Sequence, residues 1–156
     1  MNDGSNPIIQ TEPIYAALFE LAKTTPGIKL ASRRSMPFPQ VDMNSTPALF
    51  QRQETEIHTP SDDGLNASRT LFVTLTILVA VPDNSKDPAS VKLNQLKDAL
   101  VQTLAPSRRG KKWVPQTLGM PGVRLAQVNG AIEIGENETG NMAIAVVPVE
   151  ILVMQP

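Results

Sequence analysis

The sequence lacks cysteine altogether, and it contains a single histidine among 156 residues. The absence of cysteine excludes disulfide bonds, thiolate metal sites and cysteine nucleophiles. No apolar run reaches the roughly 18 residues of a membrane span, and the net charge of −1 gives no reason to expect bulk binding to an acidic membrane or to nucleic acid. The amino terminus has no basic start followed by an apolar stretch, so we expect no secretory signal and synthesis in the cytoplasm.

Groups that could carry out catalysis are equally scarce. His58 lies beside a Thr-Pro pair in an expected surface loop, where a lone histidine is usually a bystander. No nucleophile elbow, P-loop or dinucleotide fingerprint occurs. Acidic residues cluster at two expected turns, where acids are common because turns are solvated: Asp62 with Asp63, and Glu133 with Glu136 and Glu138. We therefore expect a protein that is not an enzyme and that needs neither a cofactor nor a metal.

The clearest pattern in the sequence is the segment from Arg69 to Val81. Its odd positions from Leu71 onward are all apolar, whereas its even positions are mixed and rich in threonine. This alternation is typical of a β-strand with one face in a hydrophobic core. The even face, which includes Phe72, Thr74 and Thr76, has no evident role in that core.

Two helices and four further strands are expected around this strand. The first helix begins near Pro13 with Thr11 as N-cap, and the second begins at Asp87-Pro88, with Asp87 as N-cap and proline at the first helical position. Leucines at 93, 96, 100 and 104 form the buried face of the second helix. The other strands are expected at residues 28–33, 48–56, 123–134 and 142–154, and Pro148 indicates an edge position or a bulge in the last of them.

This order, α-β-β-β-α-β-β, predicts an α+β fold with two helices packed on one face of a mostly antiparallel sheet. A chain of this length is expected to form one domain, residues 1–156, of which residues 1–10 form a flexible arm. Fourteen prolines, about 9% against a usual value of about 5%, indicate long, stiff connections.

A basic segment is the sharpest local feature, and it consists of Arg108, Arg109, Lys111, Lys112 and Trp113. It lies in a connection, residues 106–122, whose glycines and prolines argue against regular structure, with a small hairpin as the alternative. Four cations beside the only tryptophan are suited to a protein surface, or to phosphates and a stacked base. A solubilising loop is the simpler interpretation. Residues 133–138 carry the complementary charge, but the sequence does not place the two groups relative to each other.

Several segments resemble, in the same order, the tail terminator (tail completion or minor tail) proteins of long-tailed bacteriophages. They are IYAALFELAKTTPG, KLASRR, TPALFQRQE, LFVTLTILVAV, LNQLKDALVQTLAP and TLGMPGVRLAQVNGAIEIGENETGNMAIAVVPVEILV, which together span residues 14–153. The resemblance implies a structural virion protein at the head-proximal end of the tail, with no catalytic residues. It implies a homo-oligomeric ring, typically a hexamer, that caps the tail tube, stops its polymerisation and joins the head.

The partners that this resemblance implies are other copies of the chain, the tail tube protein and the head-completion or connector protein. DNA would pass through the lumen without specific binding, and no membrane is involved. We then expect the basic segment to face the tube or a neighbouring subunit, because a channel that lets DNA slide should not bind it tightly. The even face of the long strand is expected to be covered by a neighbouring subunit or to face the ring's interior. The connections at 35–47, 57–68 and 106–122 are further candidate contacts.

The sequence is also compatible with two other classes of function. The first is a nucleic-acid-binding module that uses residues 108–113, which predicts DNA binding that weakens with salt. The second is a small-molecule enzyme or binding domain, which would need a deep pocket lined by convergent polar groups.

Overall fold

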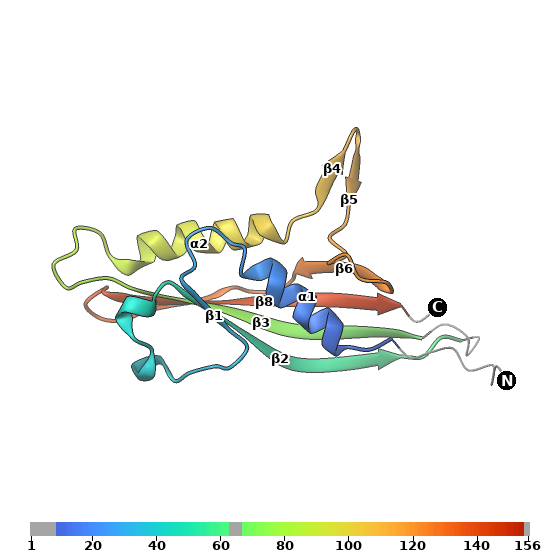
Figure 1. Cartoon of the computed structure of the whole chain (residues 1–156), viewed down its shortest axis with the longest axis horizontal. Helices are drawn as coiled ribbons and strands as arrows, with labels where there is room; N and C mark the ends of the chain where they lie inside the picture. The colour runs from blue at the N-terminus through green and yellow to red at the C-terminus, as the bar shows by residue number, and fades with distance from the viewer. Residues whose placement is uncertain (1–8, 63–66, 155–156) are drawn as a thin grey trace.

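The computed structural model describes residues 9–62 and 67–154. It confirms the predicted fold class: two helices lie on one face of a six-stranded sheet (Figure 1), ordered β1-β2-β3-β8-β6, with β7 also paired to β8. The elements are α1 (Glu12–Ala22), β1 (Leu30–Ser32), β2 (Ala48–Thr59), β3 (Ser68–Ala80), α2 (Ala89–Thr103), β4 (Ser107–Arg109), β5 (Lys112–Val114), β6 (Val123–Val128), β7 (Glu133–Glu136) and β8 (Met142–Met154). Of the expected amino-terminal arm, residues 1–8 lie outside the described residues, and Ile9 packs against the core.

Strands β3 and β8 form the centre of the sheet. They pair antiparallel over their full lengths, from Ser68 opposite Met154 to Ala80 opposite Met142. The odd residues of β3 from Leu71 to Val79 are buried, as the alternation predicted, because side chains of a strand alternate between its two faces. The opposite face of β3 is mostly half-buried.

Both helices bury the faces that their sequences predict. Ile14, Leu18 and Ala22 of α1 are buried, and so are the leucines of α2, because residues three or four apart share one face of a helix. Gln51 of β2 fixes α1 to the sheet: its Nε2 donates a hydrogen bond of 2.9 Å to the carbonyl of Tyr15. The core therefore lies between one helical layer and one sheet.

The helix starts differ in detail from the sequence prediction. Thr11 occupies the N-cap position of α1, but its side chain makes no capping hydrogen bond. Helix α2 begins at Ala89, one residue later than expected, and the N-cap is Pro88 in an extended conformation instead of Asp87. The Ala89 amide donates to the carbonyl of Gly140 at 2.7 Å. A tertiary contact thus satisfies a helix-start amide that an acidic cap was expected to serve.

The carboxyl-terminal hairpin is more complex than predicted. Its expected first strand, residues 123–134, is broken into β6 and β7, which pair with different parts of β8. Pro148 lies in the interior of the sheet, so the expected edge position is wrong. On one side, Pro148 pairs with Thr74 of β3. On the other side, the pairing of β7 with β8 ends at Val146, and the pairing of β6 with β8 begins at Val149. A residue without a backbone donor is tolerated there because it falls where β8 changes partners.

Two connections contain more structure than the sequence indicated. The segment after α2 forms the β4–β5 hairpin, which is the alternative noted above and not an irregular loop. The proline-rich segment at 35–47 holds two short 3-10 turns, Phe38–Gln40 and Met43–Ser45. Its Val41 forms a small second cluster with Ala48, Phe50 and Leu78. This cluster covers one end of the sheet face that the helices leave open.

Candidate interaction surfaces

The basic segment forms a hairpin that projects from the body of the protein (Figure 1). We call residues 107–114 the basic hairpin. Arg108 pairs with Trp113 and Arg109 with Lys112 across its two strands. The two-residue tip begins with Gly110, whose φ of 61° is a conformation that favours glycine. All the cations and the tryptophan predicted from the sequence therefore lie on one small element.

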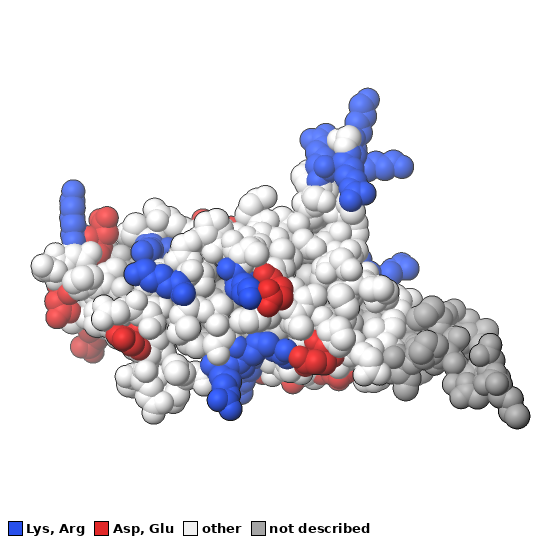
Figure 2. Space-filling view, viewed as in Figure 1, with Lys and Arg blue, Asp and Glu red and all other residues white. Residues whose placement is uncertain are grey.

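Residues 107–113 of the basic hairpin are exposed to solvent, and Val114 is half-buried. Figure 2 shows Lys and Arg side chains covering it, with no acidic side chain among them. The guanidinium of Arg108 lies 5.7 Å from the centre of the Trp113 ring, and its Nε donates to the Gly110 carbonyl at 3.2 Å. Trp113 is nevertheless 68% exposed. Within the described residues, none of the four cations forms an ion pair with a carboxylate.

A second surface is the sheet face opposite the helices, which we call the open face. Phe72, Thr74 and Thr76 lie there, together with the half-buried Ile144, Val146 and Pro148 of β8. Thr74 donates from Oγ1 to the Glu54 carboxylate at 3.0 Å. The face is therefore more apolar than the threonines of β3 alone suggested, because strand pairing adds the side chains of β8.

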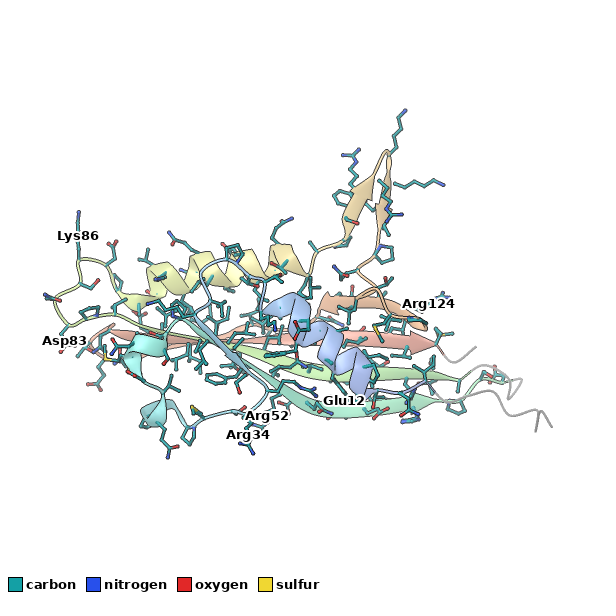
Figure 3. All side chains as sticks on the ribbon, viewed as in Figure 1. Glu12, Arg34, Arg52, Asp83, Lys86 and Arg124 are labelled. Atoms are coloured by element: carbon teal, nitrogen blue, oxygen red, sulfur yellow. The ribbon has the colours of Figure 1, made fainter. Side chains whose placement is uncertain are left out.

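A third surface lies at the amino-terminal end of α2, where the loop after β3 meets the β7–β8 turn. We call it the acidic end, and it comprises Asp83, Asp87, Glu136 and Glu138 together with Lys86. Figure 3 places Asp83 and Lys86 at one end of the molecule's long axis and Arg124 towards the other end. The sequence grouped only the glutamates; pairing of Ala80 with Met142 brings the two aspartates beside them.

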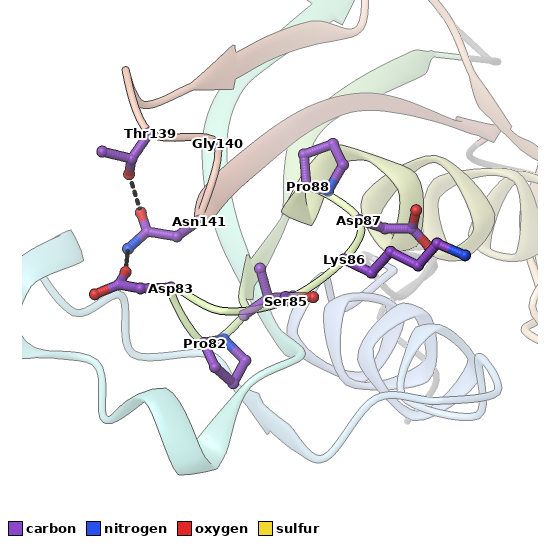
Figure 4. A pocket seen from close by; sticks show the side chains of 10 residues that line it. Pro82, Asp83, Ser85, Lys86, Asp87, Pro88, Thr139, Gly140 and Asn141 are labelled. Carbon is purple, nitrogen blue, oxygen red and sulfur yellow. Dashed lines mark hydrogen bonds between the residues drawn. The ribbon is translucent and has the colours of Figure 1, made fainter.

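Hydrogen bonds hold the acidic end in a defined shape around a shallow hollow of about 220 Å³ (Figure 4). Asn141 donates from Nδ2 to the Asp83 carboxylate at 2.6 Å, and it accepts from the Thr139 hydroxyl at 2.8 Å. Ser90 of α2 donates to Glu136 at 3.2 Å. None of the four carboxylates has an ion-pair partner within the part of the chain that the structure describes.

Other titratable groups do not converge on a site. His58 is exposed on β2, with its Nε2 3.3 Å from the Glu56 carboxylate. Among residues 9–62 and 67–154, no three His, Asp or Glu side chains are grouped closely enough to hold a metal ion. No helix in these ranges is long and apolar enough to cross a membrane.

The structure thus brings the predicted interface residues together in two places and not one. The predicted residues between Arg108 and Trp113 lie in the basic hairpin beyond the end of α2, whereas Phe72, Thr74 and Thr76 lie on the face of the sheet opposite the helices. Any partner that contacts both must wrap around the protein or consist of two different molecules. These surfaces define the protein as a small α+β domain with a projecting basic hairpin, an acidic end and a sheet face that the helices leave open.

Comparison with known proteins identifies a shared fold. The chain is similar to a chain of the virion of a native gene transfer agent (GTA) particle, with a TM-score of 0.52 and 11% sequence identity. The similarity covers 90% of this chain and 94% of that chain. No protein-family model matches the sequence, and no curated protein matches it. At this identity, the likeness shows that the two chains share a fold.

Proposed function

We propose that this chain is a structural protein of a phage-like virion, located at the head-proximal end of the tail. It forms a closed homo-oligomeric ring, with six subunits as the expected number, that caps the tail tube and stops its polymerisation. The ring also presents the surface to which the head joins. Its partners are other copies of the chain, the tail tube protein and the head-completion or connector protein.

The observation that carries this proposal is the fold shared with a chain of the GTA virion. That likeness extends over almost the full length of both chains, so it concerns the whole architecture and not one common motif. The second support is the ordered set of segments, from residue 14 to 153, by which the sequence resembles tail terminators. Both observations concern the architecture of the whole chain and not a reactive group, as expected for a protein whose role is assembly.

The distribution of surfaces gives independent support. A closed ring uses heterologous contacts, so each subunit must present two different and complementary surfaces. This chain has a basic hairpin and an acidic end at separate places, and an open sheet face besides. A monomer with a single self-complementary patch would instead favour a two-fold dimer.

Deletion of the coding sequence from the genome that specifies the particle tests the proposed role in ending the tail and joining the head. We expect filled heads without attached tails, and tails of uncontrolled length, because nothing would stop tube polymerisation or join the two parts. Electron microscopy of lysates measures both. Intact particles with tails of normal length would refute the proposed function.

A nucleic-acid-binding role is the second candidate, because an exposed tryptophan lies beside four cations that form no ion pair with a carboxylate of the described residues. It predicts retention of DNA at low salt, and weaker retention with each cation that is removed. We expect no such retention, since the chain as a whole carries a net charge of −1. Filter binding with double- and single-stranded DNA separates the two functions.

A further inference from the structure

We infer that the basic hairpin of one copy of this chain docks against the acidic end of a second copy. This contact would join neighbouring subunits head to tail, and it rests on the proposed ring. The partner is therefore another molecule of the same protein, recognised by charge and by the exposed indole.

The charge distribution supports this pairing. The hairpin carries a formal charge of +4 while the whole chain carries −1, so the rest of the chain carries −5. The acidic end accounts for a formal −3 of that excess, from four carboxylates and Lys86. Complementary potentials of this kind steer association and fix register.

The two charged groups cannot neutralise each other within one molecule. Helix α2 lies between them. Asp83 and Asp87 precede its start at Ala89, Glu136 accepts a hydrogen bond from Ser90 in its first turn, and the hairpin follows its end at Thr103. A helix of 15 residues is about 22 Å long at about 1.5 Å per residue. This exceeds the Debye length of about 10 Å at 0.1 M salt, so within one chain the attraction is largely screened. A second copy can bring the groups into contact.

Both surfaces are preformed, which lowers the entropic cost of docking. The loop of the acidic end is tied to the β7–β8 turn through Asn141, and the Gly140 carbonyl is tied to the first amide of α2. The hairpin is held by its strand pairing and by the Arg108–Trp113 stack. Binding does not require either segment to fold.

Trp113 supplies the apolar part of the contact. A tryptophan that is 68% exposed on a projecting hairpin can bury a large area, and tryptophan and arginine are the residue types most enriched at energetic centres of interfaces. Trp113 is also the only tryptophan in the chain, so its fluorescence reports on the hairpin alone. Docking should shift its emission to shorter wavelength.

The first measurement follows mass and fluorescence together on the full chain. In about 50 mM salt, increasing protein concentration should raise the mass measured by light scattering and shift the Trp113 emission in parallel. In about 500 mM salt both changes should need a roughly tenfold higher concentration. Assembly without an emission shift would show that a different surface joins the subunits, and it would overturn the inference.

A charge-exchange experiment identifies the two partners. The hairpin variant R109E/K111E/K112E and the acidic-end variant D87K/E138K should each fail to assemble, since each presents two ends of like charge. An equimolar mixture should assemble. The negative hairpin of the first variant can bind the positive altered end of the second, and the unaltered hairpin of the second can bind the unaltered acidic end of the first. A mixture no heavier than its separate components would overturn the inference.

A matched control separates specific docking from a general effect of net charge. The variant K23E/K29E/R34E makes the same charge change as the hairpin variant at exposed positions outside both surfaces. It should assemble at the wild-type concentration to within about twofold. Loss of assembly in this control equal to that of the hairpin variant would overturn the inference.

Two results would refute the inference while leaving the proposed virion role intact. One is a wild-type chain that stays monomeric at low salt. The other is a hairpin that retains DNA but does not associate with its own chain. The deletion phenotype tests the virion role separately: if tails are normal without the protein, the proposed function fails whatever the hairpin binds.

Discussion

Replacement of Leu75 by alanine tests the assignment of the two sheet faces most directly. Leu75 is fully buried on the central strand, paired with Gln51 on one side and Val147 on the other. Truncating a buried leucine costs about 2 to 5 kcal/mol, depending on how far the surroundings can close the cavity. Strands on both sides hold the backbone of Leu75 in place, so the site cannot close easily. We expect a loss of about 3 to 5 kcal/mol in the free energy of unfolding.

Urea denaturation followed by far-UV circular dichroism measures this loss. For a chain of this size, each kcal/mol corresponds to roughly 2 to 4 °C in Tm, so Tm should fall by about 6 to 20 °C. The slope of the urea dependence should not change, because the surface exposed on unfolding stays nearly the same. Leu75→Asp should prevent folding altogether, since it buries a carboxylate without a partner.

The adjacent residue provides the control. Thr76 is half-buried on the open face, one position away on the same strand. Thr76→Ala should cost less than about 1 kcal/mol in the monomer. If Thr76→Ala destabilised the monomer more than Leu75→Ala, the faces would be reversed and the description of the core would be wrong.

Three further changes give distinct outcomes. Thr74→Arg should leave the monomer's stability within about 1 kcal/mol but block ring assembly in native mass spectrometry; normal assembly, equal to that of Thr74→Ser, would show that the open face is merely solvated. The hydrogen bond from Arg33 holds the pKa of Glu12 below its ordinary value of 4.5. The stabilisation from the ionised Glu12 carboxylate is therefore present above pH 4.5 and lost as pH falls through the lowered pKa. In urea titrations at different pH, Glu12→Gln should remove this contribution to the acid dependence of the free energy of unfolding. Burial raises the pKa of Tyr15 above 10.0. The stabilisation from its neutral hydroxyl is present below pH 10 and lost as pH rises through the raised pKa, so Tyr15→Phe should flatten the alkaline limb; an unchanged limb would contradict this assignment.

The sequence by itself determined the fold class and most of the core. Alternation along β3 and the leucine spacing of α2 are local consequences of strand and helix geometry, and they identify buried faces without knowledge of the partners. The composition of the basic segment was equally visible. Its shape was not, because the choice between loop and hairpin depends on weak local preferences over only a few residues.

Only the tertiary structure decided where the charged groups lie and what the open face contains. Antiparallel pairing of β3 with β8 brings Asp83 and Asp87 beside the β7–β8 turn, although more than forty residues separate them in the sequence. The same pairing places apolar side chains of β8 beside the threonines of β3, and places Pro148 within the sheet. The start of α2 likewise depends on a hydrogen bond that the Ala89 amide donates to the Gly140 carbonyl. Such long-range contacts depend on which strands pair with each other. The alternation within one strand predicts its buried face, but it does not identify the partner strand.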